Sequence, residues 1–288
     1  MICEQCPRRC GVDRDKNPGR CKALSTFKVA RAAPHYWEEP CISGENGSGT
    51  VFFSGCSLGC IFCQNEEISS KNYGKEVSEK ELGEIFDRLI DKGVHNNNLV
   101  NPTHYALQLA DFLKKYHCPV PVVYNSGGYE RVETLAELEG LIDIYLPDLT
   151  YISAEKSLKY SHAEDYFQFA APALLEMRRQ IPQDIYDGEL MKKGMIVRHL
   201  ILPKNTKNSI AVLDWLNENL PGTAISLMAQ YTPCGSLTDF PELQRKITER
   251  EYDKVLDYME QLGIENAFVQ QLDSAQEEFI PLFDLTGV

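Results

Sequence analysis

Three cysteines in a short glycine-containing stretch are the residues with the clearest chemistry in this sequence. Cys56, Cys60 and Cys63 are spaced Cys-x3-Cys-x2-Cys between Ser54 and Asn65. Three thiolates this close together can hold three corners of a [4Fe–4S] cluster, which leaves one iron open to a ligand that is not protein. The alternative is a zinc site. Structural zinc needs four ligands, and no His or Cys follows closely enough to complete a local site.

A second group of cysteines lies near the N-terminus. Cys3, Cys6, Cys10 and Cys21 supply four thiolates, which is enough for a closed site holding either zinc or a second [4Fe–4S] cluster. Several Lys and Arg residues between positions 8 and 22 would offset the charge of those thiolates. The alternative is a reduced, partly disordered arm, and Cys41 is a spare candidate ligand.

Composition narrows the classes of protein and partner. The chain has 288 residues and a net charge of −13, so we expect no nucleic-acid partner, because such binding depends on cationic contacts to phosphates. No apolar run approaches the ~20 residues of a membrane span, and the N-terminus lacks the charged and apolar regions of a signal peptide. We expect a soluble cytoplasmic protein without membrane contact, in which clustered cysteines favour metal or redox chemistry over disulfides.

Alternating strand and helix patterns must position these cysteines. We predict a Cys-rich N-terminal segment over 1–49 and one α/β domain over 50–288. Apolar runs predict strands over 50–54, 97–101, 120–125, 142–146, 194–202, 224–228 and 267–270. Helices are predicted over 78–92, 102–116, 131–140, 163–180, 208–219 and 248–262, the first with a capping box of Ser78 and Glu81. This alternation indicates a parallel sheet, open or barrel-like, with ligands at the carboxyl ends of its strands.

The motif from Cys56 to Cys63, with Phe62 just before the last cysteine, resembles the signature of radical S-adenosylmethionine (SAM) enzymes. The closer resemblance is to a branch related to pyruvate formate-lyase activating enzymes. Further segments that carry it are 49–69, Cys6–Val12, Trp37–Pro40 and Ile280–Asp284. The resemblance implies a partial (β/α)6 TIM-like barrel with a Cys-rich N-terminal extension.

The resemblance also implies cofactors and a reaction. A [4Fe–4S] cluster would cleave SAM reductively to a 5′-deoxyadenosyl radical, which abstracts hydrogen from a substrate. The substrate is an unidentified protein or small molecule, and an activase-like attack on a backbone glycine is one form of the reaction. A flavodoxin or ferredoxin is the expected electron donor. The alternative class is a metal-binding electron carrier or zinc-stabilised scaffold without SAM chemistry.

Residues at the strand ends are the candidates for SAM contacts. They are Asn101, Thr103, Asn125, Ser126, Asp148, Arg198 and Gln230. The sequence departs from the family in two places, since no Gly-Gly-Glu stretch follows the second strand and Thr150 stands where the activating enzymes usually have Lys. Arg198 could supply the missing cation, because its planar fork suits a carboxylate. The structural alternatives are helix caps for Asn101, Thr103 and Asp148, a turn at 125–128 and a buried ion pair for Arg198.

Overall fold

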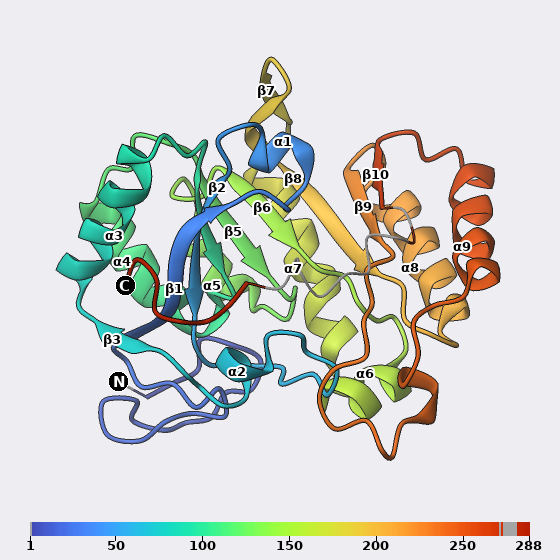
Figure 1. Cartoon of the computed structure of the whole chain (residues 1–288), viewed down its shortest axis with the longest axis horizontal. Helices are drawn as coiled ribbons and strands as arrows, with labels where there is room; N and C mark the ends of the chain where they lie inside the picture. Colours follow the sequence, from blue (N-terminus) through green and yellow to red (C-terminus); the bar gives the residue numbers. More distant parts are fainter. Residues whose placement is uncertain (1, 271, 273–280) are drawn as a thin grey trace.

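Six parallel strands, each followed by a helix, form the body of the molecule (Figure 1). The computed structural model describes residues 2–270, 272 and 281–288. The six strands, in their order across the sheet, are β2 (Ser48–Phe53), β4 (Asn97–Val100), β5 (Val122–Ser126), β6 (Ile144–Pro147), β8 (Leu190–Leu200) and β9 (Ala224–Met228). The short β10 (Ala267–Val269) extends the sheet beyond β9. The predicted partial (β/α)6 barrel is therefore confirmed.

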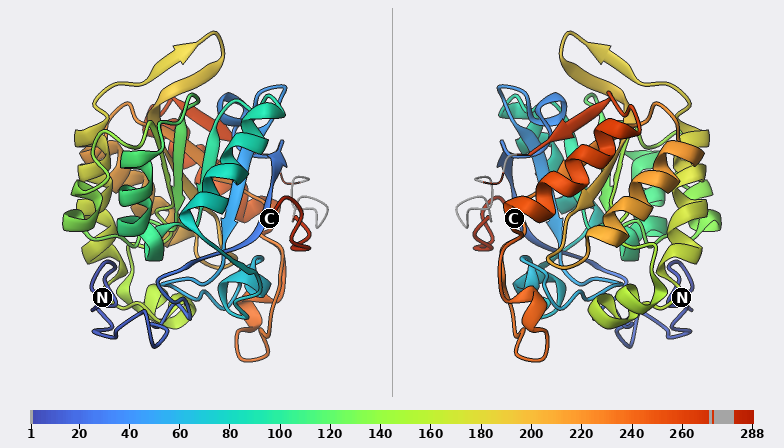
Figure 2. Two further views of the ribbon diagram at one scale, coloured as in Figure 1. Left: turned by 90° about the vertical axis from the view of Figure 1, so that its left-hand side faces the viewer. Right: turned by 90° about the vertical axis from the view of Figure 1, so that its right-hand side faces the viewer.

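Helices cover the outer face of this curved sheet (Figure 2). They are α3 (Glu79–Asp91), α4 (Ala106–Lys115), α5 (Val132–Ala136), α7 (Tyr166–Gln180), α8 (Thr206–Asn219) and α9 (Glu249–Gln261). Two shorter helices, α2 (Glu66–Ser69) and α6 (Ala154–Ser161), lie at one edge of the sheet instead. The short 3-10 turns are η1 (Thr103–Tyr105) and η2 (Pro241–Leu243). The capping box predicted at Ser78 and Glu81 is confirmed, with the Glu81 amide donating to Ser78 Oγ at 3.2 Å.

Several elements were absent from the sequence prediction. They include β1 (Phe27–His35), α1 (Pro40–Ser43), β3 (Lys75–Val77), β7 (Ile185–Asp187) and the helices α2 and α6. Strand β1 lies within the Cys-rich segment and pairs antiparallel with β2, so that segment contributes an edge to the main sheet. Of the C-terminal segment Ile280–Asp284, Ile280 lies outside the described residues.

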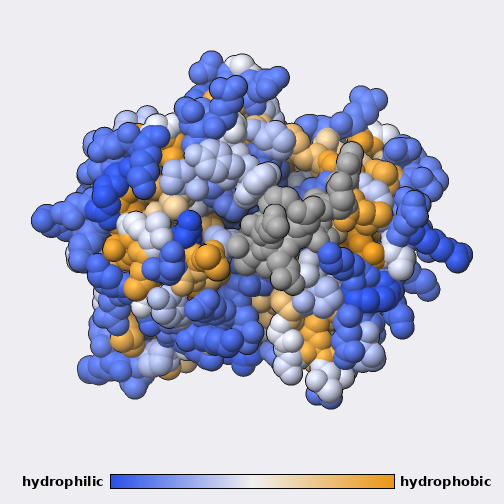
Figure 3. Space-filling model, viewed as in Figure 1, coloured by the Kyte–Doolittle hydropathy of each residue, from blue (hydrophilic) through white to orange (hydrophobic). Residues whose placement is uncertain are grey.

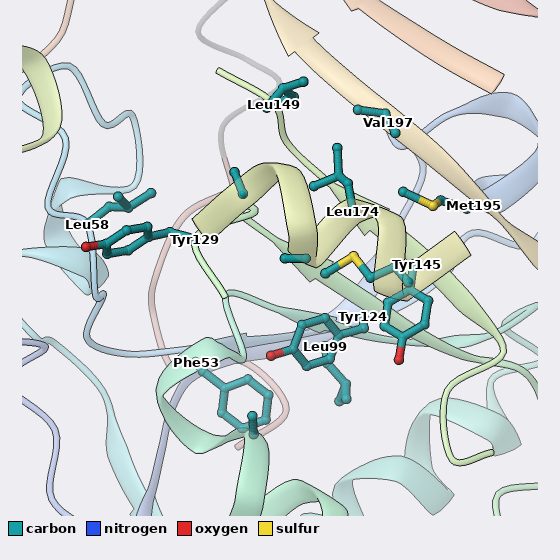
Figure 4. Close-up of a cluster of buried hydrophobic side chains, with 14 of the residues drawn as sticks. Phe53, Leu58, Leu99, Tyr124, Tyr129, Tyr145, Leu149, Leu174, Met195 and Val197 are labelled. Carbon is teal, nitrogen blue, oxygen red and sulfur yellow. The ribbon is translucent and has the colours of Figure 1, made fainter. Parts of the chain in front are cut away.

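Alternating side chains along the strands build two different interiors. On the outer side, apolar and aromatic side chains of the strands pack against the helices, among them Phe53, Tyr124 and Tyr145 (Figure 4). On the inner side, a smaller apolar cluster closes one end of the barrel, where Ile42 of α1 packs with Val123 and other strand residues. Closer to the carboxyl ends of the strands, the inward-facing side chains are polar, and they contribute to the site described below.

The carboxyl ends of the strands gather the loops and the N-terminal segment at one edge. In Figure 1 the N-terminal coil, α2 and α6 lie together along the lower edge, and both views of Figure 2 agree. Hydrophilic side chains predominate on the face drawn in Figure 3, where apolar ones form separate patches. Among the residues that the structure describes, no helix combines the length and apolar character needed to cross a bilayer.

Candidate functional site

The three-cysteine loop leaves β2 at its carboxyl end and depends on glycine at its first turn. Gly55 has φ of +90°, and a Cβ added there would lie 2.4 Å from the carbonyl oxygen of Cys21. Both the left-handed backbone and this close approach require glycine. Gly59 also has a positive φ, of +71°, but a Cβ there would meet no atom within 4 Å. The loop is therefore tightly packed at its base and open near its centre.

Each of the three sulfur atoms accepts one hydrogen bond. The amide of Leu58 donates to Cys56 Sγ at 3.4 Å. The hydroxyl of Ser69 donates to Cys63 Sγ at 3.3 Å, and the hydroxyl of Ser161, from the end of α6, donates to Cys60 Sγ at 2.9 Å. Donors aimed at sulfur stabilise the thiolate form that binds metal and also tune the metal centre.

Burial disfavours the thiolate form of these three cysteines unless a cation is bound. Desolvation raises the pKa of Cys56 to about 11, and the neighbouring Cys63 raises it further. The pKa values of Cys60 and Cys63 are raised in the same direction, chiefly by burial. Within the described ranges, no three His, Cys, Asp or Glu side chains converge as they would on one ion. A cubane is held at separate corners, so three spaced sulfurs with hydrogen-bond donors fit a [4Fe–4S] cluster.

Arg8 anchors the three-cysteine loop from the N-terminal segment. Its guanidinium donates to the carbonyl oxygens of Ser57 at 2.9 Å and His162 at 2.6 Å. Longer hydrogen bonds reach Leu58 O at 3.4 Å and Ser161 O at 3.2 Å. One side chain thus joins the cysteine loop to the end of α6, so the N-terminal segment is part of the site.

A layer of polar side chains fills the barrel beneath this loop. Arg198 of β8 donates to Asp148 Oδ1 at 2.8 Å, to Asn125 Oδ1 at 2.6 Å and to Glu38 Oε2 at 3.3 Å. Asn98 and Asn125 each donate an amide hydrogen to Glu38 Oε1, at 3.2 and 3.3 Å. We call Glu38, Asn98, Asn125, Asp148 and Arg198 the polar layer. Asp148 is also close enough to Cys60 for their charges to interact, so the layer adjoins the cysteine loop.

The polar layer and the adjacent residue Glu39 hold acceptors that are not fully paired. Burial raises the pKa of Glu38 to about 7, although Arg198 opposes that shift. The buried Oε2 of Glu39 and Oδ1 of Asn98 have no hydrogen-bond partner among the described residues. Buried acceptors of this kind are normally satisfied by a ligand or by water. The layer is therefore suited to a ligand that brings hydrogen-bond donors or positive charge.

Three of the predicted SAM contacts lie together in the polar layer, whereas the side chains of two others form hydrogen bonds elsewhere in the protein. Asn125, Asp148 and Arg198 meet in the polar layer, so Arg198 does form the buried ion pair considered as its alternative. Asn101, at φ +60°, donates its amide to the carbonyl of Gly55. Thr103 donates to Glu130 Oε1 at 2.5 Å. Neither Asn101 nor Thr103 caps the helix that follows.

The side chains of the remaining strand-end residues, Ser126 and Gln230, bond to groups outside the layer. Ser126 Oγ accepts from the amide of Gly128 at 3.3 Å, which agrees with the turn considered for this stretch. Gln230 contacts Met228 and accepts from Gln270 at 3.3 Å, so it lies near the edge of the sheet. Asp148 caps no helix, since Ser153 is the N-cap of α6.

Sequence reasoning missed five contributors to the site. Glu38 and Ser69 were noted only within segments resembling a family, and Arg8 only as one of several cations. Asn98 was predicted only as part of a strand, and Ser161 carried no signal, because a serine near a metal looks like any other serine. Their partners are distant in sequence: Glu38 and Arg198 are 160 positions apart, and Cys60 and Ser161 are 101 positions apart.

Comparisons with known proteins agree with this geometry. Residues 42–151 match the family described as a 4Fe-4S single cluster domain. An uncharacterized protein of Methanocaldococcus jannaschii, MJ0674, is 27% identical over 273 residues, covering 91% of this chain and 75% of that protein.

Solved structures share the fold at low sequence identity. Methylornithine synthase (PylB) matches with a TM-score of 0.54 and 14% identity, over 83% of this chain and 71% of that one. SuiB of Streptococcus suis, bound to the precursor peptide SuiA, matches with a TM-score of 0.52 and 15% identity, over 77% of this chain. The match covers 48% of the SuiB chain, so this chain corresponds to about half of SuiB. At these identities the two matches show a shared fold, and the iron–sulfur domain match includes the whole three-cysteine loop.

Proposed function

We propose that this chain is a radical SAM enzyme in which Cys56, Cys60 and Cys63 hold a [4Fe–4S] cluster and SAM occupies the space between that cluster and the polar layer. The observation that carries the proposal is the three-cysteine loop at the carboxyl ends of the parallel strands, adjoining Asp148. Ligands of such folds bind at this end of the strands. When bound, the cluster and SAM supply a one-electron cleavage that yields methionine and a radical able to abstract hydrogen.

The polar layer would hold the amino-acid end of SAM, which carries one carboxylate and one ammonium group. The planar fork of Arg198 matches a carboxylate. Glu38 and Asp148 offer carboxylate oxygens to the ammonium group. These oxygens would replace the family's Gly-Gly-Glu stretch, which this sequence lacks. A SuiB structure of the same fold is bound to S-adenosylmethionine, which supports this use of the fold.

A fourth thiol beside the loop bears on whether one iron stays open. Cys234 donates its S–H to the carbonyl oxygen of Phe62 at 2.9 Å and is close enough to Cys63 for their charges to interact. Our proposal assigns Cys234 no role as a cluster ligand. A Cys234→Ser variant should therefore retain both the cluster and its response to SAM.

Product formation tests the proposal. Anaerobically reconstituted, chemically reduced protein should convert SAM to methionine and 5′-deoxyadenosine. Cys60→Ala should abolish this conversion, whereas Cys118→Ala, which changes a cysteine that contacts Asn97 instead, should leave it intact. Absence of 5′-deoxyadenosine from the wild-type protein would favour the alternative, a metal-binding electron carrier or zinc-stabilised scaffold.

The substrate and the electron donor belong to the same proposal. The substrate is a protein, as in an activase-like reaction, or a small molecule, and flavodoxin or ferredoxin is the proposed donor. The fold accommodates a precursor peptide in SuiB and is that of methylornithine synthase in PylB. Incubation with deuterium-labelled candidates should transfer deuterium into 5′-deoxyadenosine only when the true substrate is present.

A further inference from the structure

We propose that Cys3, Cys6, Cys10 and Cys21 form a second, closed metal centre that holds the N-terminal segment against the three-cysteine loop. This inference does not depend on the proposed SAM chemistry. It rests on how the described residues bring four thiols from separate turns into one small region. The ligand is an iron–sulfur cluster, which four thiolates hold at separate corners, because within the described ranges no three of these side chains converge as they would on one zinc ion.

The backbone around the four thiols folds into short turns that present them to one another. The amide of Cys3 donates to Val12 O at 2.9 Å and its carbonyl accepts from Gly11 at 3.0 Å, so the chain doubles back after Cys10. The amide of Arg9 donates to Cys6 O at 3.1 Å, which closes a turn just after Cys6.

A second turn brings Cys21 next to Cys10. The amide of Lys22 donates to Gly19 O at 2.9 Å. A Cβ added at Gly19 would lie 3.5 Å from Cys10 Sγ and 3.6 Å from Cys21 Sγ, so both sulfurs flank the same point. The thiol of Cys21 is also within electrostatic range of Cys3, and that of Cys6 is within range of Cys3 and Cys21. Cys10 and Cys21 therefore lie close together and Cys3 and Cys6 lie in the same region, although no three of the thiols converge on one point.

The surroundings of these thiols favour bound metal over free thiol groups. Cys3, Cys6 and Cys21 are buried, and none of the cysteines forms a disulfide. The amide of Arg20 donates to Cys10 Sγ at 3.2 Å, a contact typical of metal-bound sulfur. The side chain of Arg14 is also buried, and its guanidinium donates to the carbonyls of Ala23, Leu24 and His104. Its charge faces Cys21 and would offset that of the thiolates.

The proposed centre is joined directly to the three-cysteine loop. The amide of Cys56 donates to the carbonyl of Cys21 at 3.2 Å. Arg8 follows Cys6 by two residues and binds the loop through Ser57 and Leu58. Gln5, beside Cys6, donates to His104 O at 2.8 Å, which ties the same turn to the barrel. A metal that fixes the four thiols would therefore fix the anchors of the loop.

The test uses a full-length variant in which Cys56, Cys60 and Cys63 are all changed to Ala, so that any metal left belongs elsewhere. After anaerobic reconstitution with iron and sulfide, we expect this variant to retain about four irons with matching sulfide per chain. Adding Cys6→Ser should remove that metal, whereas adding Cys118→Ser should leave it. Retained iron and sulfide support the centre. A triple variant without iron, or equal iron in the Cys6→Ser and Cys118→Ser versions, overturns it.

Thiol labelling covers the case in which Cys6→Ser fails to fold. The wild-type protein is alkylated under native conditions with and without a metal chelator, and each cysteine is quantified by mass spectrometry. Cys10 is the most accessible of the four and should react at least about tenfold faster after chelation, while Cys118 should be unchanged. Equal reactivity of Cys10 in both conditions would overturn the proposal.

Discussion

Replacement of Arg8 by Ala tests the finding that the N-terminal segment builds the cluster site. The change removes hydrogen bonds to four backbone carbonyls, two of them at 2.6 and 2.9 Å. A hydrogen bond from a charged donor contributes about 1.5–3 kcal/mol. Because Arg8 is half-buried and two of its bonds are long, we count only the two short ones at the lower value, which gives about 3 kcal/mol. If the loop must be held in place before it binds the cluster, cluster affinity should fall about 100-fold.

Competition with an iron chelator measures this loss. Reconstituted Arg8→Ala protein should release its iron at about 100-fold lower chelator concentration than the wild type. Arg9→Ala is the matched control, since Arg9 is the adjacent residue in the same segment and its side chain is exposed. Equal iron retention by the wild type, Arg8→Ala and Arg9→Ala would refute the claim that Arg8 positions the loop.

Three further predictions concern the loop and the barrel. Gly55→Ala should lower the unfolding free energy by about 3 kcal/mol, because this residue has a positive φ and the added Cβ would clash with a backbone oxygen. Gly59→Ala should cost only about 1 kcal/mol, because its φ is also positive but the added Cβ meets no atom. Equal losses for the two variants in urea unfolding would contradict this. Burial raises the pKa of Glu130 to about 7, so its stabilising protonated form is present at low pH and lost as the pH rises through that value. Glu130→Gln should therefore add up to about 3 kcal/mol of stability near pH 8.5 and little near pH 5, and a gain equal at both pH values would show the sign to be wrong. Arg198→Lys keeps the positive charge but loses the planar guanidinium that matches a carboxylate. This variant should reduce SAM-dependent 5′-deoxyadenosine formation at least about tenfold, with its iron content unchanged. Unaltered product formation would remove Arg198 from the proposed SAM contacts.

The sequence predicted the repeating part of the fold because each strand and helix has a local pattern. The capping box at Ser78, the apolar strands and the cysteine loop after the first strand of the barrel can all be read from neighbouring residues. Strand β1 was missed because it lies in a segment dominated by cysteines and turns. The pairing of Ala32 with Val51 is a tertiary property that local pattern does not encode.

The candidate site was predicted in part for the same reason. Asp148 follows β6 and Arg198 lies on β8. Because these two strands are parallel neighbours, the two residues could be placed near each other. Glu38 could not, because it enters the barrel from outside the repeating units. Asn101 has the residue type of a ligand or cap, yet its left-handed backbone directs its amide to the cysteine loop. Residue type and spacing therefore identify the candidate metal ligands more readily than the residues that position them.

The response of the reduced cluster to SAM tests the central claim most directly. Electron paramagnetic resonance of reduced, reconstituted protein should show a [4Fe–4S] signal that changes when SAM is added, and Cys234→Ser should show the same change. Cys60→Ala should show no such response. A wild-type cubane signal that is identical with and without SAM would mean that no iron is open, and it would contradict the proposed function.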